Sequence, residues 1–247
     1  RPHVRREDAW GVRERRALLK QGNGRRRRSG VVSAVTTGRD GAAPPDGPIA
    51  RRAPALEVAP DGAAEDVERL WYEVYVEELG VDHPCADDRT NRVHDALAGR
   101  GRLAVARGTD GRVAGTCLVL RGGADNALDF YARLFELDPT DSGVSVTTKM
   151  VVASWARRSR LAFELACDAY RYGLRSGIHT DFADCQPSRL PFFKRLGYRV
   201  VPGASDHPYY GRSIRLRLAL HDEAHLERVG SPFLRILRQE REARATD

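Results

Sequence analysis

Residues 147–177, TTKMVVASWARRSRLAFELACDAYRYGLRSG, decide the fold. The β-branched run at residues 144–153 predicts a strand. After an arginine-rich turn, residues 157–177 have the pattern of a long helix that ends at a glycine. Residues 178–185, IHTDFADC, predict a second strand. A strand, a long helix and another strand in succession predict a crossover connection within one sheet.

Further elements are expected on both sides of this stretch. Upstream we predict a helix at residues 64–80, a hairpin formed by 102–108 and 112–121, and a helix at 126–138. Downstream we predict a helix at 188–197, strands at 198–201 and 212–220, and a broken helix at 222–245. The order predicts an α/β (α+β) fold: a mixed, mostly antiparallel central sheet flanked by helices, with a long crossover helix after the fourth strand. The absence of GxGxxG and Walker sequences disfavours a Rossmann or P-loop enzyme.

Composition limits the class of protein. The 247 residues are 41% hydrophobic and 30% charged, as in a soluble globular protein. No apolar run approaches the ~18 residues of a membrane span, and no signal core follows the N-terminus, so we expect a cytoplasmic protein without membrane contact. The cysteines are widely spaced and form no CxxC pair, which predicts reduced thiols and no metal site.

The positive charge of the chain is concentrated at its beginning. Residues 1–54 contain 14 Lys and Arg against five Asp and Glu, whereas the remainder contains 27 against 29 and carries a net charge of −2. Dense glycine, proline and arginine predict a flexible or weakly structured arm at 1–54, which could attract an acidic partner or be a solvated extension. The other predicted units are a domain at 55–221 and a C-terminal helical tail at 222–247.

A family resemblance rests on the order of four motifs. The strand TTKMVVASW, the turn ARRSRLA, the long helix and FFKRLGYRVV resemble the acyl-CoA-binding half of the GNAT superfamily of N-acetyltransferases. Together with the tail DEAHLERVGSPF, they resemble more narrowly the N-acyl amino acid synthases, relatives of the acyl-homoserine lactone synthases. The resemblance runs from about residue 66 to residue 233 and implies a GNAT-like fold. It also implies acyl transfer from a thioester to an amine.

The arginine-rich turn is the candidate site for the donor's phosphates. A helix N-terminus has unpaired N–H groups and a positive dipole end, and the turn Arg157, Arg158, Ser159 and Arg160 adds full charges. In the family the fourth position of this turn is glycine, and here it is Arg160. That replacement favours a single carrier-borne phosphate, so we expect an acidic acyl or peptidyl carrier protein as partner, with acyl-CoA as the alternative donor.

The resemblance also implies roles around the thioester. It places the backbone of Met150, Val151 and Val152 against the pantetheine arm, where it polarises the thioester carbonyl. Phe193 occupies a position at which many relatives carry a tyrosine that protonates the leaving thiolate. Tyr198, Tyr209 and Tyr210 are alternative donors of that proton, although each is also a candidate for packing.

Candidates for the acceptor chemistry lie on the strand after the long helix and in the loops. Asp184, His179 and His207, with Asp181, are candidate general bases, and strand alternation separates Asp181 from Asp184 across the sheet. Cys185 could hold an acyl group, although no recognisable His/Asn spacing supports a nucleophile. Glu77 and Glu78 could bind an acceptor amine or be ordinary charges on a helix surface.

The sequence therefore predicts an N-acyltransferase of specialised-metabolite biosynthesis. Its acceptor would be a small-molecule amine, and its co-substrate a phosphopantetheine thioester or acyl-CoA, with no tightly bound cofactor. Two alternatives stay open. One is an amide-forming enzyme that takes its acyl group from aminoacyl-tRNA, with the basic arm on phosphates. The other is a non-catalytic GNAT-like domain that binds a ligand or partner.

Overall fold

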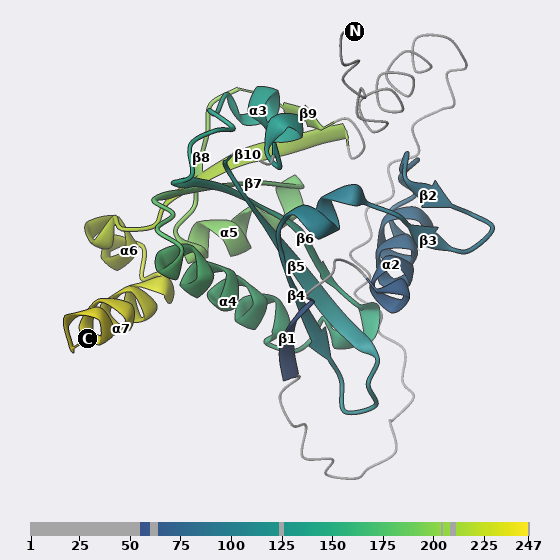
Figure 1. Ribbon diagram of the computed structural model, residues 1–247, viewed down its shortest axis with the longest axis horizontal. Helices are drawn as coiled ribbons and strands as arrows, with labels where there is room; N and C mark the ends of the chain where they lie inside the picture. The colour runs from purple at the N-terminus through teal and green to yellow at the C-terminus, as the bar shows by residue number, and fades with distance from the viewer. Residues whose placement is uncertain (1–54, 60–63, 124–125, 204, 208–210, 247) are drawn as a thin grey trace, which may run out of the picture. The chain divides into compact units, whose positions relative to one another are not determined.

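A central sheet organises the part of the chain that the structure describes. The computed structural model describes residues 55–59, 64–123, 126–203, 205–207 and 211–246, so the predicted arm at 1–54 lies outside it. Within this part, eight strands form one sheet in the order β1-β4-β5-β6-β7-β10-β8, with β9 paired to β10 (Figure 1). The strands are β1 Ala55–Ala59, β4 Arg102–Arg107, β5 Val113–Arg121, β6 Val144–Val152, β7 Thr180–Cys185, β8 Arg199–Val200, β9 Ser205–His207 and β10 Gly211–Ala219. A separate hairpin pairs β2 Ala86–Asp87 with β3 Arg92–Val93.

The helices lie where the sequence periodicity predicts them, with shorter bounds. They are α2 Glu65–Tyr72, α3 Asp129–Phe135, α4 Leu161–Arg175, α5 Leu190–Leu196, α6 Glu223–Arg228 and α7 Phe233–Thr246. A π-helical segment, η1 Glu73–Glu78, continues α2, and 3₁₀ turns occur at η2 Ala96–Arg100, η3 Ser154–Ala156 and η4 Pro187–Arg189. Among the described residues, none of the helices has the length and apolarity that crossing a membrane requires.

The sheet confirms the predicted mixed, mostly antiparallel class. Every pair of neighbouring strands in it is antiparallel except β6 and β7, which run parallel because α4 crosses over between them. β6 is the fourth strand of this sheet along the chain, so the crossover helix lies where it was predicted. The strands β1, β2, β3 and β9 were not predicted, since each is short or lies next to turn residues.

The parallel pair opens after three residues. β6 and β7 pair only from Val144 with Thr180 to Val146 with Phe182, and Figure 1 shows the two strands diverging. The later residues of β6 therefore do not pair with β7, although they remain beside β5. An opening between two neighbouring strands leaves backbone N–H and C=O groups directed into the gap, where they need other partners.

Two layers of helix cover the sheet. On one face α4 packs through Leu161 and Leu165, and α7 packs beside its C-terminal end (Figure 1), where Phe233 stacks on Tyr170 with ring centroids 4.2 Å apart. The predicted C-terminal tail thus contributes to the buried core. On the opposite face α2 places the indole Nε1 of Trp71 against Thr116 Oγ1 of β5, at 3.0 Å. We refer to these as the α4 face and the α2 face.

One glycine ends α5 as the sequence predicts. Gly197 has φ of 110°, a left-handed conformation that L side chains rarely adopt. A Cβ at this position would also lie 2.7 Å from a methyl group of Leu226. Both constraints require glycine at the junction between α5 and the segment that leads to β8.

Candidate functional site

A β-bulge interrupts β6 just beyond the point where β7 leaves it. Between the pairs Thr116–Val151 and Leu118–Thr148, β5 contributes one residue and β6 contributes two. Lys149 in the bulge has φ of 51°, a left-handed conformation that is costly for a residue with a side chain. Its carbonyl accepts a hydrogen bond from Thr116 Oγ1 at 2.9 Å, so a neighbouring side chain holds the bulge.

The bulge sends two successive side chains to the α2 face. Thr148 Oγ1 lies 3.1 Å from the hydroxyl of Tyr131 in α3. The ammonium of Lys149 lies 5.0 Å from the ring centre of Tyr75 and 5.4 Å from that of Trp71, on the same face. A regular strand would have directed Lys149 to the α4 face, because side chains alternate. The extra residue therefore places a cation on the α2 face.

Lys149 forms a buried ion pair. Its Nζ lies 2.8 Å from Asp95 Oδ2, and both side chains are less than one-tenth exposed. Burial opposes the charge on Lys149, but Asp95 together with Tyr75 and Tyr131 outweighs it, so the pKa of Lys149 lies above its ordinary value. Burial likewise opposes the charge on Asp95, and Lys149 holds the pKa of this carboxyl below its ordinary value. Both groups are therefore charged at neutral pH.

Two buried histidines stand beside this ion pair. His83 Nε2 lies 3.5 Å from Lys149 Nζ, and its ring stacks on Tyr75. Burial, and then the charge of Lys149, lower the pKa of His83 to about 4. Burial, followed by Lys149 and His83, lowers the pKa of His207 to about 3. Both imidazoles are neutral at physiological pH, which leaves Lys149 as the cation of this group.

The structure brings two of the predicted catalytic residues to the α2 face. His207 lies in β9 with its ring 6.1 Å from that of Phe130 in α3. Asp184 lies in β7, with Ser213 of β10 as a hydrogen-bond partner that lowers its pKa and Tyr131 close enough to feel its charge. Burial has the larger effect and raises the pKa of Asp184 to about 6. Asp184 is therefore a carboxylate at neutral pH that can still accept a proton.

The other two predicted catalytic residues lie elsewhere. His179 precedes β7, at the end where β6 and β7 pair, and its Nε2 lies 3.5 Å from Asp141. Cys185 is part of the core on the α4 face, with Leu216 and Phe193. Burial, and then the charge of Asp184, raise the pKa of the Cys185 thiol to about 11, so it is protonated at neutral pH. The observed faces agree with the alternation that separates Asp181 from Asp184.

The predicted phosphate turn connects β6 to α4. Arg157, Arg158, Ser159 and Arg160 are all exposed. Ser159 Oγ accepts the backbone N–H of Leu161 at 3.2 Å, which satisfies one of the N–H groups at the start of α4. Arg157 donates through Nε to the carbonyl of Val152 at 3.0 Å and forms an ion pair with Glu78.

Glu77 and Glu78, the predicted acceptor-binding pair, are both exposed at the end of η1. The pairing of Glu78 joins it to Arg157 of the donor turn, so two residues predicted to bind different substrates contact each other. The structure gives Glu77 a weaker role, as one of several charges that raise the pKa of Tyr72.

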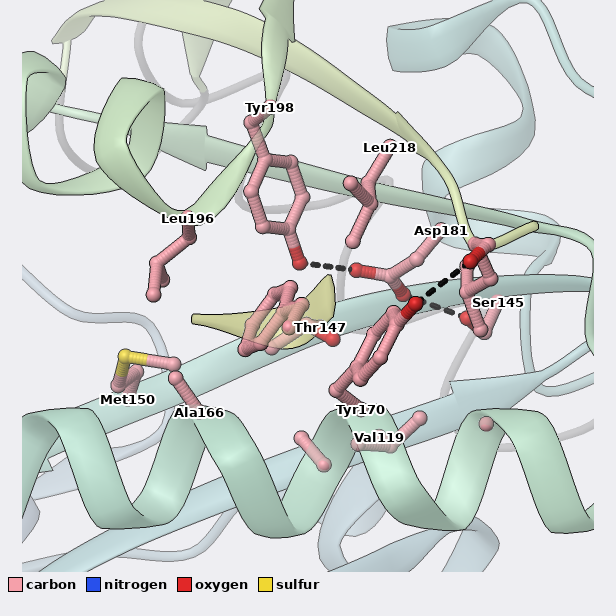
Figure 2. A pocket seen from close by; sticks show the side chains of 14 residues that line it. Val119, Ser145, Thr147, Met150, Ala166, Tyr170, Asp181, Leu196, Tyr198 and Leu218 are labelled. Carbon is pink, nitrogen blue, oxygen red and sulfur yellow. Dashed lines mark hydrogen bonds between the residues drawn. The ribbon is translucent and has the colours of Figure 1, made fainter. Parts of the chain in front are cut away.

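The predicted thioester strand is divided by the bulge. Val151 and Val152 pair with Thr116 and Gly115 of β5, whereas Met150 falls in the bulge. The side chain of Met150 lies on the α4 face and lines a small cavity between α4 and the sheet (Figure 2). The cavity volume of about 20 Å³ is enough for about one water molecule.

A buried carboxyl lines the same cavity. Asp181 accepts hydrogen bonds from Ser145 of β6 and from the hydroxyl of Tyr198, the latter at 2.5 Å (Figure 2). Burial raises the pKa of Asp181 to about 6, against the opposing effect of these donors and Thr147. Asp181 thus joins β6 to β7 and to Tyr198, two residues beyond α5, one residue before the pairing of the two strands ends.

Phe193 and Tyr198 pack together in the core on the α4 face. Phe193 is buried, and its ring meets that of Tyr198 edge-on with centroids 5.4 Å apart. Burial, and then the charge of Asp181, hold the pKa of Tyr198 well above its ordinary value. The alternative proton donors Tyr209 and Tyr210 lie outside the described residues.

Comparison with known proteins supports the architecture. No protein-family model and no curated protein matches the sequence. Solved structures do match, among them the CoA-dependent acyl-homoserine lactone synthase BjaI, solved with SAM and isopentyl-CoA (TM-score 0.53, 18% identity, 68% of this chain and 82% of that one). Two others are the acyl-homoserine lactone synthase LasI (0.53, 17%, 68% and 91%) and FeeM, an N-acyl amino acid synthase from uncultured soil microbes (0.54, 12%, 74% and 97%).

The chain has a GNAT-like fold. This architecture confirms the GNAT-like fold that the resemblance implied, while the low identities leave the roles of individual residues to their geometry. The bulge and the opening both lie along β6, and the turn before α4 follows the end of this strand. Among the described residues, no group of three or more His, Cys, Asp or Glu side chains could hold a metal ion.

Sequence reasoning missed the polar group around Lys149. One signal was present: a lysine in the middle of a β-branched strand, where burial of a charge requires a partner. Its partner Asp95 lies 54 positions earlier, and His83 precedes it by 66. Neither distance corresponds to a local motif, so only the fold connects these residues.

Proposed function

We propose that the protein is an N-acyltransferase that moves an acyl group from a thioester to an amine. The observation that carries this proposal is the opening between β6 and β7, which lies beside the bulge at Lys149 and near Asp184. Three arginines at the end of β6 supply positive charge where the donor's phosphate would enter. The fold of structures described as acyl-homoserine lactone and N-acyl amino acid synthases adds support.

The proposed reaction needs positioning more than strong acid or base chemistry. The thioester carbonyl would lie against backbone N–H groups of β6 beyond Val146, which stabilise the developing oxyanion. The amine nitrogen attacks the carbonyl carbon and its proton passes to Asp184, whose pKa suits a proton acceptor at neutral pH. The C–S bond then breaks, and the thiolate leaves and takes up a proton. One amide and one thiol are formed.

The donor is proposed to present a phosphopantetheine arm. Arg157 is paired with Glu78, so the arginines of the turn that are available for a phosphate are chiefly Arg158 and Arg160. Two guanidinium groups match one phosphate of a carrier-borne arm better than the pyrophosphate of CoA. An acidic carrier protein of a specialised biosynthetic route is therefore the preferred donor, with acyl-CoA as the alternative that the description of BjaI supports.

The test combines matched donors with a panel of amines. The purified protein is incubated with acyl-CoA and acyl-carrier thioesters of the same acyl groups, and thiol release is measured with and without each amine. Mass spectrometry then identifies the amide. Amine-dependent thiol release with either donor class supports the proposal, and the class with the higher kcat/KM identifies the donor. Absence of amine-dependent release with every pair would reject it.

A non-catalytic binding domain is the second candidate. The observation that favours it is the buried Phe193, which has no hydroxyl, at the position where the resemblance implies a tyrosine. The same assay decides between the two functions. Saturable binding of a thioester by calorimetry, without thiol release in the presence of any amine, is the outcome that supports a binding domain.

A further inference from the structure

Lys149 combines three features that are individually unfavourable. It is a charged residue at 5% exposure, it adopts a left-handed backbone conformation, and it lies in the middle of a strand. Each costs free energy unless surrounding groups offset it. Asp95 and the faces of Trp71 and Tyr75 provide that compensation from α2, η1 and the segment that leads into η2. The arrangement therefore anchors the bulge of β6 to three other elements.

The anchor acts on the same backbone that the proposed reaction uses. Lys149 is the bulged residue, and its own carbonyl is held by Thr116, which in turn accepts the indole N–H of Trp71. The side chain and the carbonyl of Lys149 are thus both fixed by the α2 face. Loss of either contact would free the bulge and move the N–H groups that follow it.

The charge of Lys149 also affects other titratable groups on the α2 face. His83 contacts it directly, and His207 in β9 and Tyr131 in α3 are close enough to feel its charge. Asp95, Asp184 and Tyr75 also interact electrostatically with members of this group. The charge of Lys149 disfavours protonation of both histidines. The same charge disfavours the protonated form of an amine that binds beside it.

We propose that Lys149 is a positioning residue of the acyl-transfer site: its ammonium, held by Asp95, fixes the bulged backbone that activates the thioester and keeps one positive charge beside His83 and His207. This inference rests on the proposed function. It assigns Lys149 two effects on the reaction. The anchored bulge raises kcat by holding the oxyanion donors in place, and the fixed charge favours the neutral, nucleophilic form of the acceptor amine.

The experiment uses the full chain with paired substitutions. K149M removes the charge and leaves Asp95 buried without its partner, so the double variant D95N/K149M provides a neutral replacement that avoids an isolated buried carboxylate. K149R keeps the charge. The matched control is R102M on the α4 face, because Arg102 also forms an ion pair, with Asp168, and also lies over an aromatic ring, that of Tyr172. Circular dichroism and thermal unfolding check that each variant is folded.

Two readouts separate this inference from the proposed function. Proton NMR titration of His207 requires no activity: its pKa should rise above the wild-type value in D95N/K149M, although burial still keeps it below the ordinary histidine value of about 6.5, and it should stay unchanged in K149R and R102M. In the acyl-transfer assay, D95N/K149M should lose at least tenfold in kcat with donor KM within threefold, and its pH–rate profile should need a higher pH to reach the plateau. K149R should recover most of kcat.

The outcomes distinguish the two claims. An unchanged His207 pKa together with normal kcat in the folded double variant overturns the role of Lys149 and leaves the proposed function standing. A kcat loss in R102M equal to that in D95N/K149M also overturns it, since any ion pair would then suffice. If the wild type shows no amine-dependent thiol release, the proposed function fails. The His207 titration then decides whether Lys149 sets the charge of this face.

Discussion

Arg157, at the start of the turn before α4, forms an ion pair with Glu78, 79 residues earlier at the end of η1. The same guanidinium donates to the carbonyl of Val152, the last residue of β6. One side chain thus holds together η1, the strand with the bulge and the candidate phosphate turn. The contact suggests that donor binding at the turn is coupled to the position of η1.

Substitutions in the arginine turn and at Glu78 test that coupling. We expect Arg160→Ala to raise the donor KM roughly threefold to tenfold, about 0.7–1.4 kcal/mol, with little change in kcat, since a phosphate contact affects binding. Arg157→Ala should act in the same direction. Glu78→Gln should leave the donor KM equal or lower, because the freed guanidinium becomes available to phosphate. Steady-state kinetics measure all three, with the exposed Arg69→Ala as control. A normal KM in both arginine variants contradicts the assignment of the turn.

Asp184 should determine the acidic limb of the pH–rate profile. A base with a pKa of about 6 is active when ionised, so activity should fall as pH decreases through 6. Asp184→Asn should lower kcat by about 10² or more and abolish this limb. Ser213→Ala removes a hydrogen bond that favours the ionised form, so it should move the limb to higher pH. A limb that is unchanged in Asp184→Asn would show that another group accepts the proton.

Cys185 should be dispensable for acyl transfer. Its thiol is buried on the α4 face with a pKa of about 11, which leaves almost no thiolate at neutral pH. Cys185→Ala should keep kcat within about threefold, apart from the effect of a small cavity on stability. Rapid-quench mass spectrometry of the wild type should detect no acylated Cys185. An acyl group trapped on this residue during turnover would contradict the prediction and require a covalent route.

Asp181 should make the protein less stable as pH rises. Its folded pKa of about 6 lies above the ordinary 3.8, so its favourable contribution is complete below about pH 4 and is lost as pH rises through 6. The shift of about two pKa units corresponds to up to about 3 kcal/mol. Asp181→Asn should therefore weaken the pH dependence of the unfolding free energy between pH 4 and pH 7.5, as measured by urea denaturation. The exposed Asp138→Asn, whose wild-type carboxyl has a lowered pKa, should not flatten it.

The elements of the fold were predictable because their signals are local. The β-branched run of β6, the long amphipathic α4 and the glycine after α5 are each recognisable within about ten to twenty residues. Their order was enough to predict the crossover and the mixed sheet. The short strand β9 was not predicted, because its three residues lie between glycine and proline in a segment that resembles a loop.

The cluster of polar residues on the α2 face was harder to predict from the sequence. Asp184 and His207 were candidates by residue type, and alternation correctly separated Asp184 from Asp181. The sequence predicted Lys149 only as part of a strand, because a bulge depends on the register with β5 and has no local signature. The pairing of Arg157 with Glu78 likewise depends on η1 approaching the end of β6, a contact that neither segment encodes alone.

The bulge in β6 depends on a single residue. Thr147 and Met150 face α4, whereas Thr148 and Val151 belong to the other side of β6, so omission of Lys149 would leave a strand with regular alternation. Every remaining side chain could keep its surroundings. The cation and the kink would disappear together. A one-codon deletion is therefore expected to leave a chain that folds but lacks the proposed acyl-transfer site.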